Sequence, residues 1–244
     1  MSSNSIDITF DFRKDAGGRD VDKASPTLKR FHQLLWSKPL PNGQEFSLLD
    51  GEKDSYLDYK SKEKVFHLSS DAISNSYRNT KRLSLIINGL DKEVEKFQEI
   101  GWLIGGYIVF PKKSADGGLS INQARGFNKV ISDRFDFTLE CIKCHYLGLS
   151  NPLENVLNRN ADFFQLFSSF AQYVEFFLLQ DLVDANFESI LFFTQVNSAS
   201  DWGLPKSKEE YLEYMQNSMA FTQKRNERIQ IWAENHLGKG RRVE

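Results

Sequence analysis

The chain opens with an alternation of apolar and polar residues and then changes to a helical spacing. Residues 6–12, IDITFDF, alternate and predict a strand. Ser25 and Pro26 have the residue types of a helix N-cap and first turn. We therefore expect a helix over PTLKRFHQLLW, which SKPLPNG ends with its prolines and an Asn-Gly turn.

The segment that follows contains short strand-like pieces and one helix. EFSLL, SYLDY and VFHLSS are short apolar stretches between turn residues, as strands are. KEVEKFQEIGW, residues 92–102, has helical spacing, and GGYIVFP, residues 105–111, predicts a further strand.

A long helix is predicted in the centre of the chain. Ser120 and Gln123 match a capping box, and the helical pattern continues to about Gly148, a length of roughly seven turns. Asn160 is expected to cap another helix that reaches about Asp184.

The last elements complete the expected fold. SILFFTQ, residues 189–195, predicts a strand, and Ser207 with Glu210 predicts a helix to about His236. Strands on both sides of a helical centre predict an α+β class, with a small mixed or antiparallel sheet packed against a Phe-rich, long-helix core. We expect one core domain over residues 1–200, and a C-terminal helix with a short basic tail over residues 201–244.

Composition narrows the class of protein. The 20 phenylalanines indicate a filled core, and the formal net charge of −2 gives no strong nucleic-acid signal. Residues 161–183 are too often interrupted by polar side chains to span a membrane, and the N-terminus has no secretory pattern. With two cysteines, a cytoplasmic location is expected.

The sequence Cys141-Ile142-Lys143-Cys144-His145 matches the motif of c-type haem attachment. On the expected helix both cysteines extend the apolar face, where a free cysteine behaves as a small buried side chain. Haem also needs an axial partner and an export route, which nothing here indicates. We interpret the cysteines as structural, leave a zinc or redox role open, and reject haem, so no cofactor is predicted.

Asp133, Asp136 and Glu140 would share one stripe of the expected long helix. Such a stripe could hold a divalent metal or supply an acid–base pair. A solvated, salt-bridged face is the simpler interpretation.

The loop between residues 13 and 25 gathers charged side chains, among them the Asp20 and Asp22 pair, before a helix N-terminus, where ligand groups commonly bind. We take Arg13, Arg19 and Asp20 as the candidate ligand contacts. A flexible polar turn is the alternative.

Three stretches, SPTLKRFHQLLWSKPLPNG (25–43), INQARGFNKVISDRFDFTLECIKCHY (121–146) and VEFFLLQDLV (174–183), resemble a bacterial family that carries only a domain-of-unknown-function label. The resemblance runs from about Phe10 to the last helix and implies a bacterial, cytoplasmic setting.

Since no catalytic motif was found, we expect a binding protein for a small polar ligand or a protein partner. The alternative is a metal-dependent hydrolase or transferase that uses the carboxylate-lined helix face.

Overall fold

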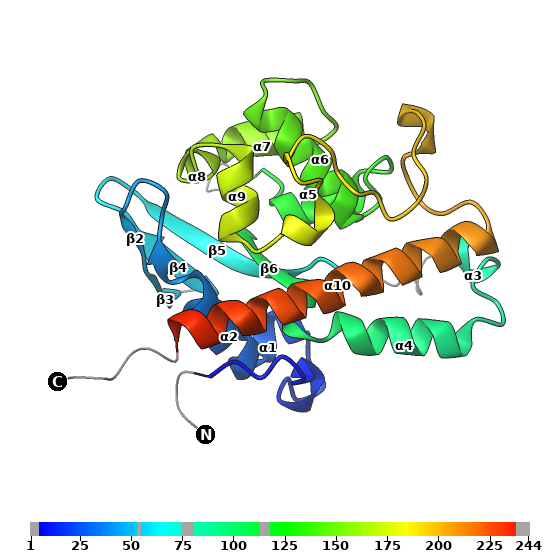
Figure 1. Ribbon diagram of the computed structural model, residues 1–244, viewed down its shortest axis with the longest axis horizontal. Helices are drawn as coiled ribbons and strands as arrows, with labels where there is room; N and C mark the ends of the chain where they lie inside the picture. The colour runs from blue at the N-terminus through cyan, green and yellow to red at the C-terminus, as the bar shows by residue number, and fades with distance from the viewer. Residues whose placement is uncertain (1–4, 53–54, 75–80, 113–117, 238–244) are drawn as a thin grey trace.

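The computed structural model describes residues 5–52, 55–74, 81–112 and 118–237. It confirms the α+β class in a single domain (Figure 1). Strands gather in a sheet, helices cover it, and α10 (Lys208–His236) lies along α4 (Asp91–Gly101).

The main sheet is a four-stranded antiparallel meander in the order β3 (Leu48–Asp50), β4 (Leu57–Lys60), β5 (Val65–Ala72) and β6 (Tyr107–Pro111). A second, two-stranded sheet pairs β1 (Lys38–Pro39) with β2 (Glu45–Phe46). The strands predicted around residues 45–73 and 105–111 therefore exist.

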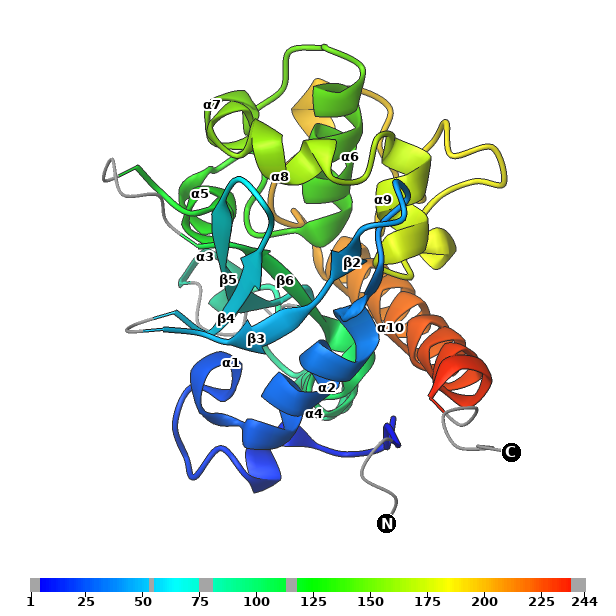
Figure 2. The ribbon, with the colours of Figure 1, turned by 90° about the vertical axis from the view of Figure 1, so that its left-hand side faces the viewer.

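The sheet lies between two groups of helices (Figure 2). Beneath it in that view are α1 (Val21–Ala24), α2 (Pro26–Trp36) and α4. Above it are α5 (Ile121–Phe127), α6 (Phe135–Tyr146), α7 (Glu154–Arg159), α8 (Ala161–Gln165) and α9 (Phe170–Phe176). The remaining short elements are η1 (Phe12–Lys14), α3 (Lys81–Ser84), η2 (Ile104–Gly106), η3 (Gln180–Leu182) and η4 (Ala199–Asp201).

Helix α10 is anchored to the rest of the domain by Arg225, which is completely buried. Its guanidinium donates to four main-chain carbonyls, those of Leu178, Gly105, Tyr107 and Phe177, at 2.8–3.1 Å. One side chain thus joins α10 to β6 and to the turn after α9. The basic tail expected beyond α10 lies outside the described residues.

Two predicted strands are absent from the places expected. Residues 6–12 keep an alternating burial pattern, but the Asp7 and Asp11 carboxylates bind the N–H groups of Thr9 and Arg13 and turn the chain. Residues 189–195 form only an isolated bridge between Ile190 and Val183.

The long central helix was also predicted wrongly. It breaks after α5, because the Asn128 side chain accepts from the N–H groups of Val130 and Ile131. Ser132 and Asp133 then adopt positive φ angles of 51° and 59°, and α6 begins only at Phe135.

The helix expected over residues 160–184 is broken as well. Positive φ angles at Ser168 (58°) and Leu178 (54°) separate α8, α9 and η3. The turns let Phe167 and Phe177 both pack on the Tyr173 ring, at centroid distances of 5.4 and 4.9 Å. A compact aromatic cluster therefore replaces one continuous helix.

Within the described residues, none of the helices combines the length and the apolar character that a membrane crossing needs.

Candidate functional site

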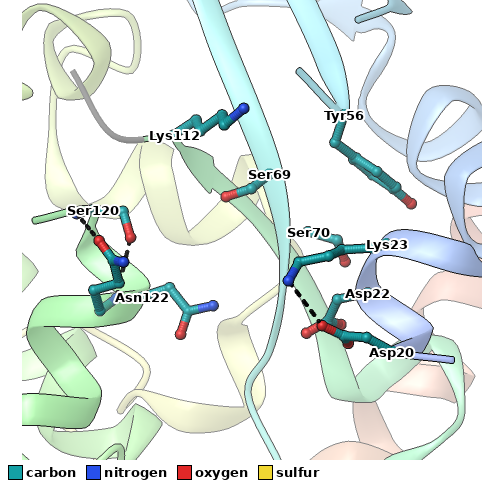
Figure 3. A pocket seen from close by; sticks show the side chains of 10 residues that line it. Asp20, Asp22, Lys23, Tyr56, Ser69, Ser70, Lys112, Ser120 and Asn122 are labelled. Atoms are coloured by element: carbon teal, nitrogen blue, oxygen red, sulfur yellow. Dashed lines mark hydrogen bonds and ion pairs between the residues drawn. The ribbon is translucent and has the colours of Figure 1, made fainter. Parts of the chain in front are cut away.

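A pocket of about 420 Å³ opens on both sides of strand β5 (Figure 3). One half is lined by Asp20, Asp22, Lys23, Tyr56 and Ser70. The other half is lined by Ser69, Lys112, Ser120 and Asn122, and by Gln123, which bonds to Ser120. Every one of these side chains carries a hydrogen-bonding group, so the pocket suits a polar molecule.

Short helix α1 brings the acidic half of the pocket against β5. Asp20 is its N-cap residue, and the buried Val21 fixes it to the core. The preceding loop is held by Asp15, which accepts from the Ser25 hydroxyl at 2.6 Å and from the Thr27 N–H at 3.0 Å. Because Asp15 holds the loop before α1 and Val21 anchors α1 in the core, Asp22 has a defined position beside β5.

Asp22 has the most unusual environment in the pocket. Burial and, to a smaller extent, the negative charges of Asp71 and Asp20 together raise the pKa of its carboxyl from 3.8 to about 7, against the opposing effect of a hydrogen bond from the Ala72 N–H. Its Oδ1 atom is buried and has no hydrogen-bond partner among the described residues. Asp22 therefore titrates near neutral pH and has a spare acceptor atom.

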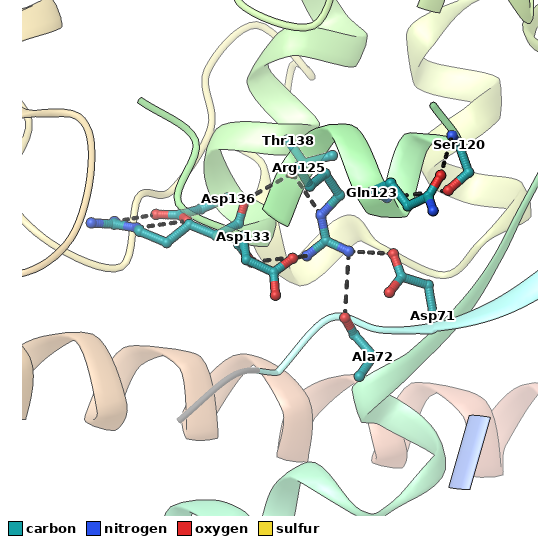
Figure 4. A network of polar contacts seen from close by, with 9 residues as sticks. Asp71, Ala72, Ser120, Gln123, Arg125, Asp133, Asp136 and Thr138 are labelled. Carbon is teal, nitrogen blue, oxygen red and sulfur yellow. Dashed lines mark hydrogen bonds and ion pairs between the residues drawn. The ribbon is translucent and has the colours of Figure 1, made fainter. Parts of the chain in front are cut away.

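A buried ionic network lies next to the pocket residues of β5 and α5 (Figure 4). Arg125, which is fully buried, bonds to the Asp71 carboxylate, to the Thr138 hydroxyl at 3.0 Å and to the Asp133 carbonyl at 2.9 Å. Burial raises the pKa of Asp71 to about 6, although the Arg125 charge opposes this shift. The network joins β5, α5 and the turn before α6.

Ser70 and His32 form a buried pair behind the pocket. The Trp36 indole N–H donates to His32 Nδ1 at 3.0 Å, so the ring proton of neutral His32 is on Nε2. That Nε2–H faces the Ser70 hydroxyl at 3.1 Å. Burial, with a smaller effect of the Arg225 charge, lowers the pKa of His32 to about 3. His32 therefore cannot accept the Ser70 proton as a general base does.

The structure separates the three candidate ligand contacts. Asp20 lines the pocket, whereas Arg13 pairs with Asp11 at 2.5 Å and its guanidinium carbon lies 5.8 Å from the Trp102 ring centre. Arg19 is exposed on the loop and does not line the pocket. A ligand-contact role for the two arginines stays a prediction.

The three carboxylates expected on one helix stripe do not share a helix, because Asp133 lies in the break before α6. Each pairs with a different cation: Asp133 with Arg125, Asp136 with Arg134 and Glu140 with Lys143. No group of three metal-ligating side chains gathers in the parts of the chain that the structure describes. The geometric basis of the metal hypothesis is thus lost, and metal binding itself stays untested.

The cysteine motif lies on α6 with both thiols free. Cys141 is buried, and burial raises the pKa of its thiol to about 12. Cys144 is half-buried and donates to Glu140, and the His145 ring packs on Phe164 at a centroid distance of 5.2 Å.

Sequence reasoning missed most of the pocket. It noted Asp20 and Asp22, but not the contributions of Tyr56, Lys112 and Asn122. One signal was present: the strand VFHLSSDA carries three consecutive polar residues just before its last position, Ser69 to Asp71, of which Ser70 and Asp71 are buried. Buried polar residues at a strand end need partners and often mark a site.

A family model matches residues 6–229, and its description is a family of unknown function, DUF6994. The chain belongs to this DUF6994 family. No curated protein and no solved structure matches it. The DUF6994 region includes both halves of the pocket.

Proposed function

We propose that this protein binds a small polar ligand in the pocket beside β5. The observation that carries the proposal is the spare Oδ1 acceptor of Asp22, which is buried and has no partner among the described residues. Native proteins pair nearly all buried polar atoms, and a donor group on a ligand would pair this one.

The other lining groups support binding rather than covalent catalysis. Hydroxyl, amide, carboxylate and ammonium groups face the same space, which suits a molecule with several hydrogen-bonding groups. In the Ser70–His32 pair, the ring proton lies on the nitrogen that a general base would need free.

Native mass spectrometry of the protein purified from cells under mild conditions tests the proposal. We expect a fraction with mass above the 28.2 kDa of the bare chain, or, after stripping, binding of hits from a set of polar fragments. Asn122→Trp fills the pocket and should abolish this binding. Asn42→Trp is the matched control, because Asn42 lines a separate groove with Lys64 and Asp162.

Retained mass or fragment binding in Asn122→Trp would contradict the proposed pocket. A protein partner and the cytoplasmic location expected from the sequence stay predictions beside it.

A further inference from the structure

Strand β5 presents main-chain hydrogen-bonding groups to the pocket. It bonds to β6 through its odd-numbered residues: Ile73 N–H donates to Gly106 O at 2.8 Å, and Lys112 N–H donates to His67 O at 2.7 Å. In an antiparallel pair, the residues between such bonding positions turn their main-chain groups to the opposite side. The even-numbered residues of β5 therefore face the β4 side.

β4 ends before it reaches Ser70. The register of the two strands stops with Leu57 opposite Leu68, and Ser55, which would be the next partner opposite Ser70, donates its N–H to the Glu52 carbonyl instead. Neither the N–H nor the C=O of Ser70 bonds to a residue that the structure describes. Ser70 is only 4% exposed and lines the pocket, and main-chain groups buried in this way almost always have a partner.

Asp22 extends the same edge. Ala72 is the next even-numbered residue, and its N–H bonds to the Asp22 carboxylate. The spare Oδ1 of Asp22 thus lies beyond the Ser70 carbonyl along the strand. The edge offers, in order, one donor (Ser70 N–H) and two acceptors (Ser70 C=O and Asp22 Oδ1).

We infer that the ligand has a planar edge with one acceptor followed by two N–H donors, which is the edge of the 2-amino-4-oxopyrimidine ring shared by guanine and pterin bases. This inference rests on the proposed ligand-binding function. The base carbonyl accepts from Ser70 N–H, the ring N–H donates to Ser70 C=O, and the exocyclic amino group donates to Asp22. The last bond is charge-assisted, which makes it the strongest of the three.

The same edge discriminates among related bases. Hypoxanthine lacks the exocyclic amino group, so its binding leaves Asp22 unpaired. Adenine presents its donor and acceptor in the opposite order. A site built to bond a donor rejects an analogue that lacks it, because the buried acceptor stays unsatisfied.

The half of the pocket across β5, with Lys112, Ser120 and Asn122, leaves space for the substituent on the base (Figure 3). A sugar would occupy it in a guanine nucleoside, and a short side chain in a pterin.

Titrations of the full chain, followed by amide NMR, test the inference with guanosine and pterin as probes and with inosine and adenosine as controls. We expect guanosine or pterin to shift the amide signals of Ser70 and Ala72, and whichever binds tighter identifies the source of the base. Inosine should bind at least tenfold more weakly than guanosine. Asp22→Asn should remove that difference, whereas Asp162→Asn, on a separate groove, should keep it.

Three results would overturn these claims in different ways. If other polar fragments shift Ser70 but guanosine and pterin do not, the base-edge inference is wrong and the binding function stands. Equal affinity for guanosine and inosine in the unsubstituted protein also refutes the base-edge inference, but it leaves the proposed binding function standing. If no fragment shifts the amide signal of any pocket residue, both the base-edge inference and the proposed function are wrong.

Discussion

Replacing Asp22 with asparagine should make the protein more stable at alkaline pH. The carboxyl of Asp22 has a pKa of about 7 in the folded chain against an ordinary value of 3.8. Between these values the folded state holds a proton that the unfolded state has lost, so stability falls as pH rises from about 4 to about 7. The difference between the two pKa values sets a ceiling of about 4 kcal/mol on this loss, at about 1.36 kcal/mol per pH unit.

The asparagine side chain of this variant would be neutral at every pH and would keep an oxygen for the Ala72 N–H, so Asp22→Asn should avoid the loss. Because Asp22 is partly exposed, we discount the ceiling and expect a gain of about 1–3 kcal/mol at pH 8 and almost none at pH 4.

Urea unfolding of the two proteins at pH 4, 6 and 8 measures this difference. The control is Asp162→Asn, which removes an exposed partner of Lys64 and should change stability by less than about 1 kcal/mol at each pH. A gain that is the same at pH 4 and pH 8 would refute the assignment of a raised pKa to Asp22. So would a loss of stability at pH 8.

Three further changes test the buried network and the cysteines. Arg225→Met leaves four buried carbonyls without their donor and should lower the free energy of unfolding by about 3–5 kcal/mol in urea; a loss below about 1 kcal/mol would contradict its anchoring role. Arg125→Lys replaces the guanidinium by an ammonium group that cannot bond to Asp71 and Thr138 at once, so it should lower the free energy of unfolding by about 2 kcal/mol in the same assay. An unchanged free energy of unfolding would show that the network is dispensable. A thiol reagent should label Cys144 in the native protein and Cys141 only after unfolding, so two fast thiols would disagree with the packing of α6.

The helices with local end signals could be predicted from the sequence. The Ser25 hydroxyl accepts from Leu28 N–H at 3.1 Å, and Ser120 and Gln123 form the expected reciprocal capping box. Ser207 likewise caps α10, which ends at His236 as expected. These signals lie within a few residues of the helix end, so they need no knowledge of the rest of the fold.

The break after α5 combines local bonds of the Asn128 side chain with a contact to a residue distant in sequence. Asn128 ends α5 while its amide donates to Pro152 O, 24 residues away. The buried Arg134–Asp136 pair also prevents a strand near residue 193, because Asp136 accepts from Phe193 N–H at 2.9 Å and Arg134 donates to Thr194 at 3.0 Å. Periodicity cannot show such competition between side chains and main chain.

The candidate site was only partly predictable for the same reason. Asp20 and Asp22 were noted on the loop, but the pocket exists because α1 packs beside the end of β5, a contact between segments about fifty residues apart. The polar end of VFHLSSDA was the local sign that this strand has an unusual neighbour.

The unpaired end of β5 explains why an acidic residue with an unfavourable charge lies there. An open strand edge normally invites pairing with another chain, and charged side chains placed on it prevent this. Asp22 covers the Ala72 N–H and so protects the edge, yet a carboxylate that accepts only one bond there is destabilised by burial near neutral pH. An asparagine would cover the same N–H without that destabilisation. An acidic side chain that lowers stability at a position where a neutral one would suffice is most simply explained by a gain in ligand binding. A charged acceptor binds an N–H donor more strongly than a neutral acceptor does. Stability and affinity should therefore move in opposite directions in Asp22→Asn, which is the result that separates a binding role for Asp22 from edge protection alone.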